Sequence, residues 1–174
     1  MPKLRTRRTL PVALGAAGIV LAPGPAFAGA GEWHVGGRLG AATVRHGSLG
    51  PALDLHAGYE LSDYFDVVMQ ATASRHDGSA GPTALTASAG IAYKIDVFEW
   101  IPYVSALGGY YRYEGPKGAS NQSAGWSLHG GVDYLVSRSF SLGGDVGFHA
   151  ILGESPPVSL QTTFLVGAEY RFGW

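Results

Sequence analysis

The closing stretch of the chain, Val158 to Trp174, constrains the fold more than any other segment. Read at every second position, one set of its side chains is mostly apolar, and the intervening set is mostly polar or small. Successive side chains of a β-strand point to opposite faces, so the pattern predicts one long strand with an apolar and a polar face. Its final residues include Tyr170, Phe172 and Trp174, and aromatics gather in this way where a strand meets a membrane–water boundary.

The same two-residue period recurs along the chain and predicts an all-β fold of eight antiparallel strands. The predicted strands are 32–44, 52–61, 65–75, 85–95, 100–113, 126–136, 140–150 and 158–174. Both faces of 100–113 are apolar or aromatic, so the pattern leaves its orientation open. The connections alternate in length, with 62–64, 96–99 and 137–139 short and 114–123 the longest. Alternating connections of this kind favour an up-and-down transmembrane barrel.

Residues 1–28 have the features of a cleaved secretory signal peptide. Four basic residues within the first eight positions precede an apolar run from Leu10 to Ala22 that is too short to span a bilayer. Ala26-Phe27-Ala28 supplies the small residues that a signal peptidase reads, so residues 29–174 are expected to form the mature barrel domain. Removing residues 1–28 takes away four of the 12 basic residues and none of the 13 acidic ones, which leaves a net charge of −5. An acidic chain with scattered charges argues against nucleic acid as a partner.

The polar face of the strands predicts which side of the sheet lies inside the barrel. A lipocalin-like barrel in water would place its apolar face inside and many Lys and Glu residues outside. Here the polar face is mainly Gly, Ser, Thr and Ala with a few charges, which suits a crowded interior of paired polar groups. The predicted interior polar network consists of Arg38, Asp54, Glu60, Asp66, Lys94, His129, Asp133, Asp145, His149, Glu169 and Arg171. Glu60 and Asp66 are expected to be neighbours across a tight turn, with Arg171 as the cation between them.

Aromatic residues cluster at the strand ends beside the short turns, where they are predicted to lie at a membrane interface. This set is Trp33, Tyr59, Phe65, Tyr93, Trp100, Tyr134, Phe140, Tyr170, Phe172 and Trp174. A thinner girdle is expected at the opposite level, from Tyr110, Tyr111, Tyr113, Trp126 and Phe148. Two girdles around an apolar band are typical of an outer-membrane barrel.

With its signal peptide, alternating strands and closing Tyr170-Arg171-Phe172-Gly173-Trp174, the mature chain resembles the small OmpA/OmpX-type and opacity-type outer-membrane barrels. The stretch Ile101-Pro102-Tyr103-Val104 is also similar to that group. The resemblance implies a bacterial outer-membrane location, contact with outer-membrane lipid, insertion by the barrel-assembly machinery and a monomeric state. Members of the family end most often in Phe, so Trp174 departs from the pattern.

The sequence favours a non-catalytic barrel that contributes to envelope integrity or to surface interaction through its outer loops. A narrow porin-like channel for small solutes and a lipid-modifying enzyme are the alternatives.

Ser127, His129, Asp145 and His149 are expected to lie close together and could form a nucleophile with its base, but an interior hydrogen-bond network is the favoured interpretation. Asp54 and His56 are the only close pair with metal-ligating side chains, so neither a metal nor another cofactor is expected. The sequence identifies no extracellular ligand.

Overall fold

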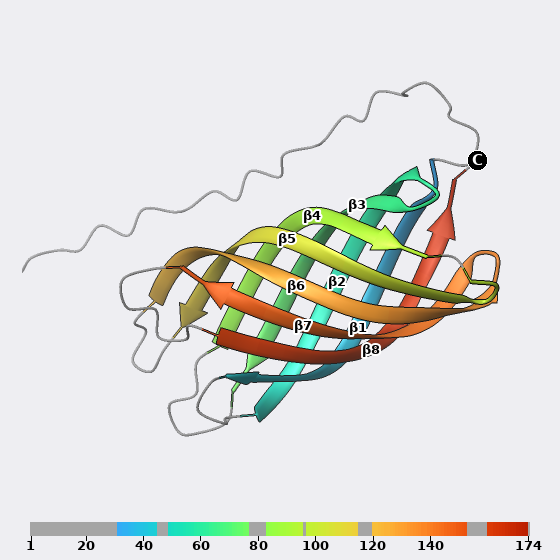
Figure 1. Ribbon diagram of the computed structural model, residues 1–174. Helices are drawn as coiled ribbons and strands as arrows, with labels where there is room; N and C mark the ends of the chain where they lie inside the picture. The colour runs from blue at the N-terminus through green and yellow to red at the C-terminus, as the bar shows by residue number, and fades with distance from the viewer. Residues whose placement is uncertain are drawn as a thin grey trace, which may run out of the picture.

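The computed structural model describes residues 31–44, 49–76, 83–95, 97–114, 120–152 and 160–173, which form a closed β-barrel (Figure 1). Each strand is antiparallel to the one before it, and the last pairs with the first. The strands are β1 (Trp33–Val44), β2 (Leu49–Ser62), β3 (Phe65–Arg75), β4 (Thr83–Lys94), β5 (Trp100–Glu114), β6 (Ser120–Ser137), β7 (Phe140–Ile151) and β8 (Leu160–Phe172). The predicted eight-stranded antiparallel up-and-down barrel is confirmed. In these ranges no helix is long and apolar enough to cross a bilayer.

The two ends of the barrel differ in their connections. At one end, here called the short-turn end, lie the turns 63–64, 95–99 and 138–139, together with the start of β1 and the end of β8. The other end, the long-loop end, carries the connections 45–48, 76–82, 115–119 and 152–159. The prediction that 114–123 is the longest connection is wrong, because β6 starts at Ser120, which pairs with Glu114 of β5. The first residues of β6 are polar and exposed, and they pair with β5 through their backbones. They show no alternation of apolar and polar side chains, so the sequence pattern did not reveal this part of the strand.

The apolar face of the sheet points outward and the polar face inward. Leu39 and Val166 are 63% and 68% exposed, whereas Asp54 and Ser127 are fully buried. A lipocalin-like barrel would show the reverse, with its leucines and valines inside. The outward band is continuous around the wall, and such an apolar surface is far larger than a water-soluble monomer tolerates.

Strand β5, whose orientation the sequence left open, turns Tyr103, Tyr111 and Tyr113 inward and Tyr110 outward. The expected outer girdle position of Tyr111 and Tyr113 is therefore wrong. Both inner hydroxyl groups have partners inside the barrel: Tyr113 Oη donates to Gln161 Oε1 at 3.1 Å, and Tyr111 Oη lies 3.3 Å from His149 Nδ1. Partners of this kind let a buried tyrosine keep its polar end satisfied.

Two apolar clusters fill the interior toward the long-loop end. Ala84, Tyr111, Tyr113 and Ile151 form the first, with Val44 packed against it. Ala42, Ala52 and Leu165 form the second. These residues lie in the half of each strand that leads to the long loops, so this half of the barrel is packed with side chains. Buried polar side chains such as His149, Gln161 and Thr163 share this half with the clusters, whereas the Lys, Arg, Asp and Glu side chains of the interior lie in the middle and the short-turn half.

The aromatic residues predicted at the short-turn end lie on the outer wall. Adjacent strands bring them into contact, with ring centroids 4.9 Å apart for Trp33 and Tyr59 and 5.3 Å apart for Phe65 and Tyr93. Within this set Trp100, Tyr134, Phe140, Tyr170 and Phe172 are all more than a third exposed. Trp174, the last of the set, lies outside the described residues, as does the predicted signal peptide.

Candidate functional site

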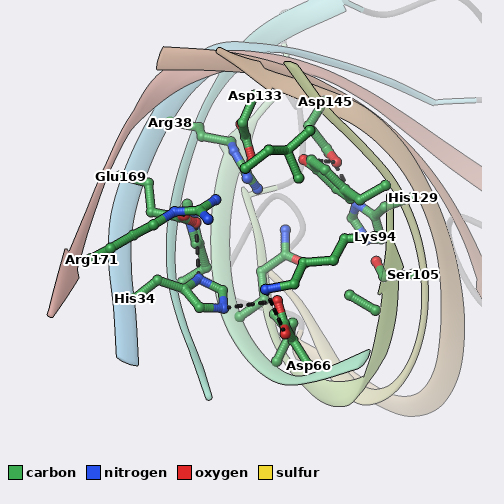
Figure 2. A pocket seen from close by; sticks show the side chains of 16 residues that line it. His34, Arg38, Asp66, Lys94, Ser105, His129, Asp133, Asp145, Glu169 and Arg171 are labelled. Carbon is green, nitrogen blue, oxygen red and sulfur yellow. Dashed lines mark hydrogen bonds and ion pairs between the residues drawn. The ribbon is translucent and has the colours of Figure 1, made fainter. Parts of the chain in front are cut away.

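The interior of the barrel contains a small polar cavity in its middle and short-turn half (Figure 2). Its volume is about 50 Å³, and charged side chains from β1, β3, β4, β6, β7 and β8 point into it. A polar cavity of this size has room for water molecules. The chemistry available here is that of the lining side chains and of the solvent between them.

Glu169 on β8 is the centre of the largest group of contacts. Its carboxylate accepts from Arg171 Nε at 3.1 Å and lies 2.9 Å from His34 Nδ1 and 3.2 Å from His56 Nε2. The closed barrel explains this convergence, because β8 pairs with β1 and β1 pairs with β2. Figure 2 shows His34, Glu169 and Arg171 on one wall of the cavity.

The two histidines of this group each face carboxylates with both ring nitrogens. The second nitrogen of His34 lies 3.4 Å from Asp66 Oδ2, and that of His56 lies 3.2 Å from Asp54 Oδ1. A neutral imidazole has one acceptor nitrogen, which cannot bond a carboxylate, so the two hydrogen bonds of His56 suit an imidazolium ring that donates from both nitrogens. His34 is hydrogen-bonded to Glu169 through Nδ1, and its Nε2 lies at ion-pair distance from Asp66 without a hydrogen bond. The interior network predicted from the sequence includes neither His34 nor His56.

Lys94 on β4 bridges the neighbouring carboxylates Glu60 and Asp66. Its Nζ contacts Glu60 Oε1 and lies 3.2 Å from Asp66 Oδ1. Glu60 and Asp66 pair directly across the β2–β3 turn, as expected. The cation between them is Lys94, so the expectation that Arg171 takes this position is wrong. Lys94 on β4 lies beside Asp66 on β3 and reaches Glu60 on β2 across that strand, whereas Arg171 on β8 contacts Glu169 on its own strand.

Arg38 and Asp133 lie on the wall of the cavity in its upper part (Figure 2). Arg38 is 8% exposed, and its guanidinium carbon lies 5.6 Å from the centre of the Tyr103 ring. A cation over an aromatic face is stabilised by the ring quadrupole. Asp133 is 6% exposed and faces the same cavity. Arg38 and Asp133 thus place opposite charges on the wall of one cavity.

Ser127, His129 and Asp145 form a chain of hydrogen-bonding groups on β6 and β7. His129 Nε2 lies 3.0 Å from Ser127 Oγ, and His129 Nδ1 lies 3.0 Å from Asp145 Oδ1. Tyr103 Oη donates to the other oxygen of Asp145 at 3.0 Å. The order of groups is that of a nucleophile, its base and an orienting carboxylate. Ser127 is fully buried inside the barrel.

His149 lies beside this chain, in the packed half of the barrel. Its ring is perpendicular to that of His129, with centroids 5.2 Å apart, and its Nε2 lies 3.3 Å from Thr163 Oγ1. The structure therefore brings the predicted group of Ser127, His129, Asp145 and His149 together. Over the ranges that the structure describes, no three His, Cys, Asp or Glu side chains are placed to hold a metal ion.

Comparisons with known proteins agree on the fold. The sequence model of the outer membrane protein beta-barrel domain matches residues 14–172. No curated protein matches the chain significantly. Neisserial surface protein A has a similar structure, with a TM-score of 0.66 and 18% identity over 83% of this chain and 97% of that one. The N-terminal barrel domain of Pseudomonas aeruginosa OprF has a TM-score of 0.61 and 13% identity over 82% of this chain and 99% of that one. The outer membrane enzyme PagL has a TM-score of 0.51 and 13% identity over 81% of this chain and 99% of that one.

Proposed function

The chain belongs to the outer membrane protein beta-barrel domain family, and from this membership we propose that it is a plugged, non-catalytic barrel of the bacterial outer membrane. Its role is to contribute to envelope integrity or to contact surface partners through its outer loops. The observation that carries the proposal is the filled interior: Tyr111 and Tyr113 are 0% and 2% exposed inside the long-loop half. Eight strands enclose a space only just wide enough for side chains.

Planar-bilayer recording of the refolded barrel tests the plug against the alternative of a narrow channel. Wild-type protein is expected to show no steady conductance, because Tyr111 and Tyr113 fill the lumen beside Ile151. The variant Tyr113→Ala opens space in the plug and is expected to give brief openings. Tyr110→Ala is the matched control, because Tyr110 lies on the same strand but faces outward. A stable wild-type channel of defined size would overturn the proposal.

A second candidate function, that of a lipid-modifying enzyme, rests on the order of Ser127, His129 and Asp145. Two features weigh against it: the serine is fully buried, and the whole group faces away from the lipid. A fluorophosphonate probe distinguishes the two, since it labels an activated, accessible serine. We expect no labelling of the folded barrel. Labelling that Ser127→Ala abolishes, while the equally buried control Ser141→Ala retains it, would establish the enzyme instead.

The partners that follow from the proposal are outer-membrane lipid around the wall and the barrel-assembly machinery during insertion. We further propose that the barrel is a monomer, because a closed barrel leaves no unpaired strand edge for another chain. Light scattering of the protein in detergent, corrected for the micelle, gives its mass. A stable dimer would contradict the monomeric state. The proposal of a plugged interior is tested separately, by the conductance measurement.

A further inference from the structure

The turn between β4 and β5 carries the most exposed large apolar side chain of the described residues. Phe98 is 88% exposed, and Val97 and Trp100 beside it are 45% and 53% exposed. The other two turns at this end have Asp63-Tyr64 and Arg138-Ser139 at their tips. Turns that face water favour small and polar residues, so an apolar tip at this turn calls for a physical explanation.

The backbone of the tip makes the choice of phenylalanine still more unusual. Val97 N donates to Trp100 O at 2.9 Å and Trp100 N to Val97 O at 3.1 Å, so Phe98 and Glu99 are the two central residues of a tight hairpin. Phe98 has a φ of 58°, in the left-handed region. Two-residue hairpin turns with a positive φ at the first central position favour glycine there, and a bulky residue is strained. In water, the exposed ring would gain nothing to offset that strain.

The tip continues an apolar column on the outer wall of the barrel. Above it, Tyr93 pairs with Val104 and both are at least 40% exposed. Below that pair, Val97 and Trp100 form the last bridge before the turn. The outer face of this hairpin is therefore apolar as far as Phe98, and the polar residue of the tip is the exposed Glu99, next to Phe98.

The tip also lies against the barrel wall. The backbone oxygen of Glu99 accepts from Leu135 N on β6 at 2.8 Å, and the Trp100 ring lies 4.9 Å from that of Tyr134. Strand β6 continues to Ser137, so its wall extends past the level of the tip. Phe98 thus lies at the edge of the lipid-facing wall, next to aromatic residues that mark this level.

We propose that Val97, Phe98 and Trp100 form a lipid anchor, which holds the tip of the β4–β5 hairpin in the headgroup–acyl boundary of the periplasmic leaflet. Short turns of outer-membrane barrels face the periplasm, which sets the leaflet. The partner is phospholipid, because the patch is continuous with the wall that lipid already covers. Burial of the ring in that boundary offsets the backbone strain at Phe98.

The absence of cysteine from the chain allows a site-specific test in vesicles of phosphatidylethanolamine and phosphatidylglycerol. Single variants Phe98→Cys and Arg138→Cys carry an environment-sensitive fluorophore, and Val166→Cys provides a lipid-facing reference, since Val166 is 68% exposed on the outer wall. Aqueous iodide and lipids with a spin label near the headgroup serve as quenchers. Iodide is expected to quench the label at position 98 on the order of threefold less than that at position 138, because the interface excludes it.

Two outcomes would overturn the proposal. The first is equal quenching by iodide at positions 98 and 138 with no quenching by the spin-labelled lipid at 98. The second is protection of position 98 only after a periplasmic extract is added, which would identify a protein as the partner. Heat-dependent gel mobility confirms that each labelled variant is folded. Phe98→Gly, which relieves the backbone strain, is expected to fold as well as wild type and provides an unlabelled control for the hairpin.

Discussion

Replacing Lys94 with methionine tests whether the interior of the barrel is dry enough for its ion pairs to determine stability. Methionine keeps most of the apolar stem and removes the charge, which leaves Glu60 and Asp66 side by side without the cation that contacts both. The side chains of the three residues are only 7% to 13% exposed. Removing one partner of a buried pair costs about 3–5 kcal/mol. We expect the lower end of that range, because His34 still lies 3.4 Å from Asp66.

The matched control is Arg112→Met at the long-loop end. Arg112 Nη2 lies 2.6 Å from Glu114 Oε1, a shorter contact than most in the interior, but both side chains are 46% exposed. An exposed pair contributes about 0–1 kcal/mol, so Arg112→Met is expected to have a small effect on the free energy of unfolding despite the good geometry of the pair.

The free energy of unfolding of each variant is measured by urea unfolding in lipid vesicles, with heat-dependent gel mobility as the readout of the folded fraction. Glu60→Gln added to Lys94→Met is expected to restore part of the loss. Equal effects of the two single substitutions would show that water screens the interior, which would refute the reasoning.

Three further predictions follow from the sequence and the interior contacts. Arg171→Ala is expected to destabilise the barrel less than Lys94→Met in the same urea assay, because Glu169 keeps two histidine contacts, but more than Arg138→Ala in an exposed turn. The intact mass of the protein from an outer-membrane fraction should correspond to a chain that begins at residue 29, and a retained basic head would contradict the signal peptide. Deleting Trp174 is expected to lower the amount in the outer membrane without lowering secretion, as measured by immunoblotting of cell fractions.

The strands could be predicted because each has one face in lipid and one in a polar interior. Strand β3 shows this best: the two-residue period predicted 65–75, and the structure gives Phe65–Arg75. A slip of one residue would put Asp66 on the outer wall and Val67 in the polar interior, so the sequence specifies this register strongly. The period disappears wherever only the backbone pairs, as in the first residues of β6, and there the predicted boundary was late.

The orientation of β5 could not be predicted from its own residues. Both faces are rich in apolar or aromatic side chains, so either could face lipid at similar cost. The partners on other strands decide it, because Tyr103 and Tyr113 find Asp145 and Gln161 only when they point inward. Those contacts join residues far apart in the chain, and no local pattern contains them.

The error over Arg171 shows which interior contacts the sequence could have supplied. Arg171 and Glu60 stand at similar levels of the barrel, but β1, whose His34 pairs with Arg171, separates their strands. Lys94 lies on β4, which pairs with β3 and places Ala92, two residues before Lys94, opposite Asp66, and Asp66 is one short turn away from Glu60. In a barrel with simple up-and-down order, strands that are consecutive in the chain are always neighbours, so charges at one level of consecutive strands are brought close together. Strand order alone does not predict the ion partner, however, because the pairs Lys94–Glu60, His34–Asp66 and His56–Glu169 each reach across an intervening strand of this narrow barrel.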